Sequence, residues 1–313
     1  MGTLGDGTTT RRLRPVRVME DVISIDVGHI HALAITSDGT LWVWGNTGFD
    51  QDGIGLSRLF MPNPVRVTDD VIYISAGGGH SMFITTDGTL WGWGSLYFDS
   101  DSDMSHLRPV IIKEDIFSVS AGRAHTLAVT NNGELWTWGR NIQGSLGDGT
   151  TENIRTPIKI MEDVIHVSAS ANSAPGGSDS HSLAITSDGV LWAWGGNRRG
   201  QLGNGTTTSS YIPIKIMEGV IYAYAGATHT MAIRYDNTLW AWGANLSGQL
   251  GDGTTTDSHI PIQVKENVIA VSTGAEHTIA ITADGGLWAW GWNEDGQLGD
   301  GTTTDRLSPI RIN

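Results

Sequence analysis

Histidine is the residue whose type and spacing in this sequence most directly suggest metal chemistry. It recurs once in each of six similar segments, as His31, His80, His125, His181, His229 and His277. Zinc holds imidazole nitrogens at ~2.0–2.1 Å, so its ligands must nearly touch, whereas equivalent residues of stacked sheets stand ~10 Å apart. We therefore predict no metal site, and we expect each ring to satisfy backbone groups in its own turn.

Acidic residues suggest two further chemistries, calcium binding and acid–base catalysis. The segment 99–103 alternates Asp and Ser like the start of a calcium loop, but Met104 replaces the required Gly and Val110 stands where the bidentate Glu belongs. Glu294 and Asp295 form a carboxylate pair, with no sign in the sequence of a perturbed pKa. The sequence also lacks a P-loop, HExxH, GxSxG and a dinucleotide fingerprint. We predict no catalytic residues and no cofactor.

Composition narrows the class of partner. The 33 acidic and 19 basic residues give a formal charge of −14, which repels phosphate backbones and anionic lipid headgroups. We therefore expect neither nucleic acid nor a membrane as partner. The absence of cysteine excludes a disulfide framework and a thiolate site, and it fits a cytoplasmic protein or a secreted one whose signal lies outside this chain. The compartment stays open.

The elements that would carry these residues form a repeat. A Leu-Trp-x-Trp-Gly strand recurs six times, with its first Trp at Trp42, Trp91, Trp136, Trp192, Trp240 and Trp288. A His-led run of alternating apolar residues and a tight turn precede each copy, which indicates a β-hairpin. An upstream run with period-two alternation and a Pro-initiated strand complete the module, so each repeat predicts four short strands.

Four-stranded modules that are apolar on both faces must stack on one another, and radial stacking into a β-propeller leaves few exposed edges. We predict an all-β propeller over residues 1–313, a single domain and a monomeric ring. Six Trp strands predict six blades rather than seven. The Pro strand occurs seven times, so we expect a terminal strand to close the ring, with one end completing the blade begun by the other.

These residues resemble a known family. The segments GTLWVWG and QLGDGTTT, the Pro strand and the G-x-x-H-S/T-L-A-I-T run are similar to the repeats of the regulator of chromosome condensation (RCC-type) family, over essentially the whole chain. Its well-known members have seven blades. The resemblance implies nucleotide exchange on a small GTPase, nucleosome binding, ubiquitin-ligase scaffolding or, in a distant secreted relative, β-lactamase inhibition, and most of these are protein-binding tasks.

Our leading interpretation is therefore a non-enzymatic propeller that binds a protein partner through one loop-bearing face. Two alternatives stay open. Exposed aromatic residues such as Tyr97 and Trp292 could stack on sugar rings, which would make the chain a lectin-like propeller. Guanine-nucleotide exchange on a small GTPase, implied by the resemblance, is the other.

The binding face is predicted from where the period of about 48 residues breaks. Departures fall in the link before the His-led strand and in the loop from the Trp strand to the Pro strand, and these two kinds of connection share a face in an up-and-down blade. Two of the irregular loops replace LGDGTTT by apolar and acidic residues. The predicted partner-binding residues are Phe49, Leu59, Phe60, Met61, Leu96, Tyr97, Phe98, Asp99, Asp101, Asp103 and Trp292, with Asp50 also on the rim.

Overall fold

The chain folds almost entirely as short antiparallel strands. The computed structural model describes residues 3–46, 53, 60–95, 105–171 and 179–312. Within them, twenty-four strands form six sheets of four, and the helical part is one short 3-10 turn, η1 (Ile142–Gly144). The fold is the predicted six-bladed β-propeller with four antiparallel strands per blade.

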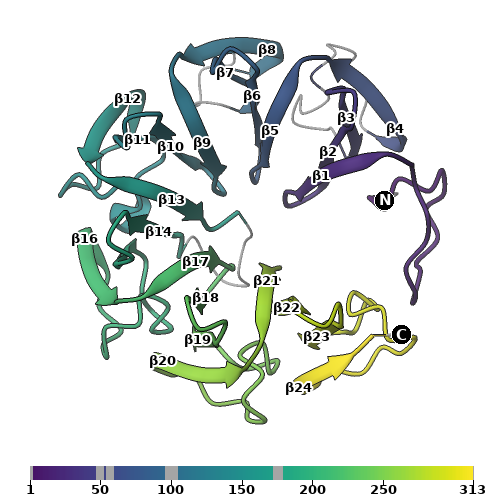
Figure 1. Cartoon of the computed structure of the whole chain (residues 1–313), viewed down its shortest axis with the longest axis vertical. Helices are drawn as coiled ribbons and strands as arrows, with labels where there is room; N and C mark the ends of the chain where they lie inside the picture. Colours follow the sequence, from purple (N-terminus) through teal and green to yellow (C-terminus); the bar gives the residue numbers. More distant parts are fainter. Residues whose placement is uncertain (1–2, 47–52, 54–59, 96–104, 172–178, 313) are drawn as a thin grey trace. The chain divides into compact units, whose positions relative to one another are not determined.

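Each blade is one continuous stretch of chain, and its strands pair in sequence order (Figure 1). Blade one comprises β1 (Val22–Val27), β2 (His31–Thr36), β3 (Leu41–Gly45) and β4 (Met61–Thr68). Blade two comprises β5 (Val71–Ala76), β6 (His80–Thr85), β7 (Leu90–Ser95) and β8 (Ser105–Lys113). Blade three comprises β9 (Ile116–Ala121), β10 (His125–Thr130), β11 (Leu135–Gly139) and β12 (Ile154–Met161). Blade four comprises β13 (Val164–Ala169), β14 (His181–Thr186), β15 (Leu191–Gly195) and β16 (Ser210–Met217). Blade five comprises β17 (Val220–Ala225), β18 (His229–Arg234), β19 (Leu239–Gly243) and β20 (Ser258–Lys265). Blade six comprises β21 (Val268–Thr273), β22 (His277–Thr282), β23 (Leu287–Gly291) and β24 (Arg306–Arg311).

The chain divides into two compact units, each with its own core. The first holds residues 1–10, 16–140 and 153–163, and therefore blades one to three. The second holds residues 11–15, 141–152 and 164–313, and therefore blades four to six. In the second unit, the second and third strands of blade five pack against blade six, where Met231 and Ile233 meet Val268 and Trp290. Burial of such side chains stabilises the folded state by ~25 cal/mol per Å² of apolar surface removed from water.

The Leu-Trp-x-Trp-Gly strand shows why each letter of the motif recurs. The second Trp of the motif is buried in all six blades, while the first is only half-buried. The terminal Gly lets the chain pass close to the link between the first two strands. Gly243 has a φ of +104°, and a Cβ built there would stand 2.5 Å from the carbonyl oxygen of Thr228. Only glycine fits this site.

The predicted closure by an exchanged terminal strand is wrong for the described pairings. The C-terminal strand β24 pairs with β23 of its own blade, through Trp288 with Arg311 and Ala289 with Ile310. Residues 15–18, the surplus Pro-initiated segment, form no strand. The physical reason is connectivity: the loop after β23 turns the chain back along that same strand, as it does in the other blades, so no fourth-strand position is left for the other end.

Candidate protein-binding face

Two connections of each blade lie together at one end of its sheet. In blades four to six, the residue that follows the third strand donates its N–H to a carbonyl of the link between the first two strands. The bonds run from Gly196 to Ser180 at 2.8 Å, from Ala244 to Thr228 at 2.9 Å and from Trp292 to Glu276 at 2.8 Å. The two kinds of connection therefore share a face, as the up-and-down order predicts.

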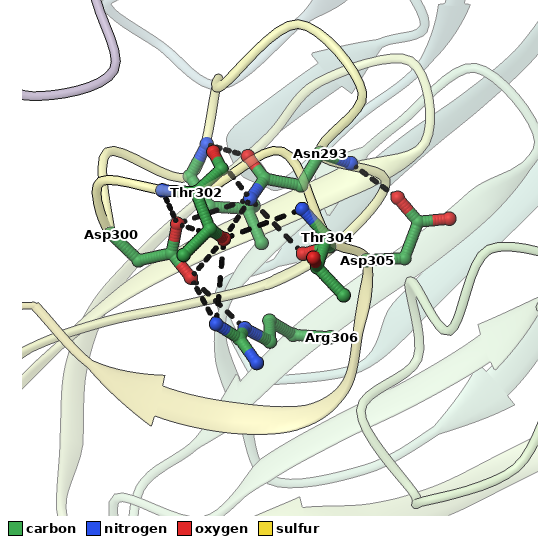
Figure 2. Close-up of polar contacts among 7 residues, drawn as sticks. Asn293, Asp300, Thr302, Thr304, Asp305 and Arg306 are labelled. Atoms are coloured by element: carbon green, nitrogen blue, oxygen red, sulfur yellow. Dashed lines mark hydrogen bonds and ion pairs between the residues drawn. The ribbon is translucent and has the colours of Figure 1, made fainter.

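The longer connection is held by one buried asparagine, as Figure 2 shows for blade six. The Asn293 amide donates to Asp300 Oδ1 at 3.1 Å and to the carbonyl oxygens of Thr302 at 3.2 Å and Thr304 at 3.0 Å. Its Oδ1 accepts the N–H of Leu298 at 3.0 Å. One fully buried side chain thus ties together a loop of a dozen residues without a regular element.

The acid in this network is strongly held in its ionised form. Burial raises the pKa of Asp300, but hydrogen bonds from Thr302 and the guanidinium of Arg306 outweigh it and bring the pKa down to about 2. Arg306 Nη2 lies 2.6 Å from Asp300 Oδ2. Charge-assisted bonds of this kind are roughly twice as strong as neutral ones.

The same asparagine occurs in the loops of blades three, four and five. The equivalents of Asn293 are Asn141, Asn197 and Asn245. Each amide oxygen accepts the N–H of the Leu that begins the Leu-Gly-x-Gly turn, at 2.9, 2.9 and 3.0 Å in that order. The QLGDGTTT residues are therefore a structural frame, which explains their repetition.

The frame is also attached to the following blade. The carbonyl oxygen of Gln201 in the blade-four loop accepts the indole N–H of Trp242 at 2.9 Å and the hydroxyl of Thr230 at 2.7 Å. The carbonyl oxygen of Gln249 does the same for Trp290 at 2.9 Å and Thr278 at 3.0 Å. Each loop is thus fixed by buried polar contacts to two blades.

Two residues directly after each frame asparagine differ from blade to blade and reach the surface. We call them the tip positions. In blades four to six they are Arg198, Arg199, Leu246, Ser247, Glu294 and Asp295. Five of the six are exposed, and Leu246 is 62% exposed. Variable side chains on a fixed loop frame are typical of binding surfaces.

The tips carry charges of opposite sign in different blades. The tip of blade four has two arginines, of which Arg199 lies 3.3 Å from Asp257 Oδ2. The tip of blade six has two acids, of which Asp295 lies 2.5 Å from Arg11. In the neighbouring loop, Glu276 Oε2 accepts the hydroxyl of Ser247 at 2.7 Å. A partner would therefore need to complement both signs.

The structure places few of the residues predicted for partner binding. Phe49, Leu59, Leu96, Tyr97, Phe98, Asp99, Asp101 and Asp103, like Asp50, lie outside the described residues. Phe60 is half-buried in the first unit and Trp292 is half-buried in the second. Met61 is 4% exposed and packs into the core between blades one and two, so the prediction that it is a partner-binding residue is wrong.

The recurring histidines have a structural role that differs from the predicted one. In four of the six, His31, His80, His181 and His229, the Nε2 atom contacts a hydroxyl of the following blade, not the backbone of its own turn. In the second unit, His181 lies 2.9 Å from Thr230 Oγ1 and His229 lies 3.2 Å from Thr278 Oγ1. Burial lowers the pKa of His229 to about 3, with a smaller effect of the charge on His277. Among the described residues, no three His, Asp or Glu side chains are placed to hold one metal ion.

The family match decides the chain's relationship to known proteins. The sequence matches the RCC1-like domain over residues 1–313. The chain belongs to the RCC1-like domain family.

Solved structures share the fold of this RCC1-like propeller. Human WBSCR16 is 23% identical, with a TM-score of 0.83 over 96% of this chain and 84% of that one. Yeast RCC1 (Prp20), solved with bound Kap60, is 21% identical, with a TM-score of 0.81 over 93% of this chain and 75% of that one. Prp20p of Saccharomyces cerevisiae, described with its binding properties to Gsp1p and histones, is 22% identical, with a TM-score of 0.79 over 93% of this chain and 77% of that one.

One further property concerns membranes. Within the part of the chain that the structure describes, no helix has the length and apolar character needed to cross a bilayer.

Proposed function

We propose that this RCC1-like propeller is a protein-binding module whose second unit contacts its partner through the tip positions and Trp292. The observation that carries the proposal is the contrast within each loop: a buried frame that repeats, and exposed tips that do not. A frame held by buried hydrogen bonds pre-organises the tips, which lowers the entropy that binding must overcome. Trp and Arg, both present here, are the side chains most often found at interface hot spots.

The geometry does not favour an enzyme. Glu294 and Asp295 lie exposed at a tip, and Asp295 is paired with Arg11. Among the described residues, burial raises a carboxyl pKa at Asp26, opposed by hydrogen bonds from the backbone of Ala76 and Val27. Asp26 Oδ2 accepts the N–H of Ala76 in the next blade at 2.8 Å. At the equivalent position of blade two, the hydroxyl oxygen of Ser75 accepts the N–H of Ala121 in blade three at 3.0 Å. This carboxylate therefore has a structural role, not an acid–base one.

Candidate partners come from the relatives. Prp20p was described with its binding to Gsp1p and histones, and yeast RCC1 was solved with bound Kap60. Small GTPases, histones and proteins like Kap60 are therefore the first to test. A charge of −14 disfavours DNA as an additional ligand and favours a partner with basic surface.

Site-directed crosslinking tests the face directly, because the natural chain has no cysteine that would react with the label. Leu246→Cys and Glu294→Cys place a photocrosslinker on two tips. Tyr235→Cys is the matched control, since Tyr235 is 69% exposed but lies in the hairpin turn at the opposite end of blade five. We expect the tip variants to crosslink one protein from an extract of the cells that produce the chain, and the control not to. Equal capture by Tyr235→Cys contradicts the proposal.

A further inference from the structure

Each first strand of the first unit exposes an apolar side chain close to its beginning. Ile23 of β1 is 66% exposed, Ile72 of β5 is 56% exposed and Phe117 of β9 is 57% exposed. The residues just before the last two, Val71 and Ile116, are 2% exposed and pack into the core. The core therefore does not account for an apolar residue at the exposed place.

A β-bulge gives these three side chains their exposure. The ladder between β5 and β6 shifts between Val71 and Tyr73, which leaves Ile72 without a residue opposite it. The same shift occurs at Ile23 in β1 and at Phe117 in β9. A bulge re-aims a side chain away from the ladder. The equivalent residues of the second unit are exposed too, so the exposure belongs to the repeat: Ile165, Ile221 and Ile269.

The exposed side chains lie beside a continuous rim of turns. This rim is at the other end of each sheet from the loop that follows the third strand. Within blade two, the N–H of Thr86 in the hairpin turn donates to the carbonyl oxygen of Asp70 in the link before β5, at 2.9 Å. From blade three, the N–H of Ile116 donates to the carbonyl oxygen of Gly88 in the same turn, also at 2.9 Å, and blade two is bonded to blade one in the same way. Since β5 contacts both β1 and β9, the three apolar side chains form one row along this rim (Figure 1).

The rim of the first unit is strongly acidic. It consists of residues 19–21, 37–40, 69–70, 86–89, 114–115 and 131–134. Nine of these residues are acidic and none is Lys or Arg, the acids being Glu20, Asp21, Asp38, Asp69, Asp70, Asp87, Glu114, Asp115 and Glu134. Neighbouring basic side chains offset three of the charges, at Glu20, Asp69 and Glu134. The five corresponding connections of the second unit carry one acid each, at Asp188, Glu218, Asp236, Glu266 and Asp284.

The turns themselves do not require these acids. Asp21, Asp70 and Asp115 stand just before the first strands, in the left-handed region with φ of +56°, +60° and +62°. At the same place the second unit has Gly219 and Asn267, with φ of +72° and +57°. Gly and Asn adopt this conformation at least as readily as Asp. The fold therefore accounts for the turn but not for its charge.

We propose that this end of blades one to three binds a segment of a partner protein in which apolar residues alternate with Lys or Arg. Its apolar side chains contact Ile23, Ile72 and Phe117, and its basic side chains contact the acidic rim. A row of exposed apolar side chains is typical of an interaction surface, and the negative charge beside it determines the charge of the occupant. The surface belongs to the unit without the tip positions considered above, so the inference stands independently of the proposed function.

The stacking of the blades sets the register of such a segment. Packed sheets stand ~10 Å apart, and an extended polyproline II chain rises ~3.1 Å per residue with three residues per turn. An apolar side chain at every third position therefore meets successive blades, and two positions between them are left for Lys or Arg. About seven residues are enough to contact all three blades.

A second copy of the chain is a poorer occupant, although residues 13–19 have apolar side chains at this spacing. The carbonyl oxygen of Leu13 already accepts the N–H of Gly301 at 2.9 Å. Arg17 is paired with Glu20 of its own chain. A second copy would have to break both contacts before it could bind.

A fluorescent heptapeptide, Leu-Lys-Arg-Leu-Lys-Arg-Leu, tests the surface on the intact protein. We expect saturable binding by fluorescence anisotropy at low salt, weakened as the salt concentration rises. The peptide with Ser in place of each Leu should bind at least tenfold more weakly, and the peptide with Glu in place of each Lys and Arg should not bind. Absence of saturable binding, or equal binding of the Ser peptide, would overturn the proposal.

The acidic rim is tested by the triple variant Asp21→Asn, Asp70→Asn and Asp115→Asn. Asn267 shows that Asn fits this turn, so the variant removes three charges and should keep the melting temperature. We expect the heptapeptide to bind at least tenfold more weakly. The double variant Ile72→Ser and Phe117→Ser should cause a similar loss, because it removes the apolar contacts and keeps the charge. Unchanged affinity in either variant contradicts the proposal.

A matched control removes three charges from the same end of the second unit. It combines Asp188→Asn, Asp236→Asn and Asp284→Asn, and Asn132 shows that Asn is accepted at this place of the hairpin turn. Affinity for the heptapeptide should change less than twofold. An equal loss in the control would mean that the peptide responds to net charge alone. Sedimentation of the protein without peptide should show no self-association that the rim variant abolishes; if it does, a second copy is the occupant and the proposed partner is wrong.

Discussion

The Nε2 atom of His229 in blade five lies 3.2 Å from the Oγ1 atom of Thr278 in blade six. The same hydroxyl donates to the carbonyl oxygen of Gln249 at 3.0 Å, so it can only accept from the ring, which places the imidazole proton on Nε2. Three segments, the second strands of two successive blades and one frame loop, thus meet at one hydroxyl. These two hydrogen bonds therefore connect the packing of blades five and six to the loop that carries the tip positions.

Removing the hydroxyl should therefore weaken the second unit. Thr278→Ala leaves His229 Nε2 unsatisfied in a fully buried place and leaves the Gln249 carbonyl oxygen with the Trp290 indole as its donor, and we expect a loss of ~1–3 kcal/mol in the free energy of unfolding. Urea denaturation at neutral pH measures it. Thr278→Ser keeps the hydroxyl and should cost less than half as much; equal costs for the two variants would assign the effect to the lost methyl group instead.

Acid should destabilise the protein well before its carboxylates titrate. Burial lowers the pKa to about 3 in His31, His125 and His229 and to about 4 in His80 and His277. The unfolded chain binds protons at these groups below pH ~6.5 and the folded chain does not, so stability falls as pH drops from 6.5 towards 4, by ~1.4 kcal/mol per pH unit for each His. Urea denaturation across this range gives the slope.

A matched variant isolates one histidine. His229→Gln keeps an N–H donor at about the same place but does not titrate, so it should reduce the slope of stability against pH by about one proton. A slope identical to that of the natural protein would show that burial does not lower the pKa of His229. The pKa of Asp300 is also lowered, to about 2, but in this case the folded state favours the charged form. Its contribution to stability is lost only as the pH falls below ~3.8.

The frame asparagine should matter more than the acid beside it. Asn293→Ala removes the donor to Asp300, Thr302 and Thr304 and the acceptor for Leu298, and we expect a loss of at least ~2 kcal/mol. Asp300→Asn is the control, because blade four already carries Asn204 at this position and makes the same contacts to its loop. Thermal unfolding compares them. A larger loss in Asp300→Asn would mean that the ion pair with Arg306, not the amide, holds the loop.

Two glycines separate backbone strain from packing. Gly285 has a φ of +77°, and no atom lies within 4 Å of the place that a Cβ would take, so Gly285→Ala should cost only the backbone term of ~1–2 kcal/mol. Gly251 has a φ of +80°, and a Cβ would stand 2.7 Å from Nε1 of the buried Trp290. Gly251→Ala should therefore cost ~1–3 kcal/mol more than Gly285→Ala in the same denaturation assay. Equal costs would show that the loop is not packed tightly on the next blade.

The repeat predicted the blades because every copy contains the full set of strands that a sheet needs. Closure was harder to predict, since seven Pro segments and six Trp strands fit several arrangements, and only the pairing of β23 with β24 decides between them. The partner of each histidine was also missed. His and the following Ser or Thr point to opposite faces of one strand, so a stacked array brings the His of one blade to the hydroxyl of the next.

The residues predicted for partner binding stay a prediction. Departures from the period directed attention to apolar loops such as 96–104, which lie outside the described residues. The tip positions were missed because they change residue type without changing loop length. A comparison of the repeats with one another would have found them, as Arg198 and Glu294 occupy the same place between constant neighbours.

The dissociation constant of the crosslinked partner shows whether the tips of blades four to six bind a protein, as we propose. The triple variant Arg198→Ala, Leu246→Ala and Glu294→Ala should weaken binding at least tenfold while the melting temperature stays unchanged, because these side chains are exposed. Tyr235→Ala, at the other end of blade five, should bind as the natural protein does. A triple variant with unchanged affinity, or a Tyr235→Ala variant with equal loss, would contradict binding through the tips.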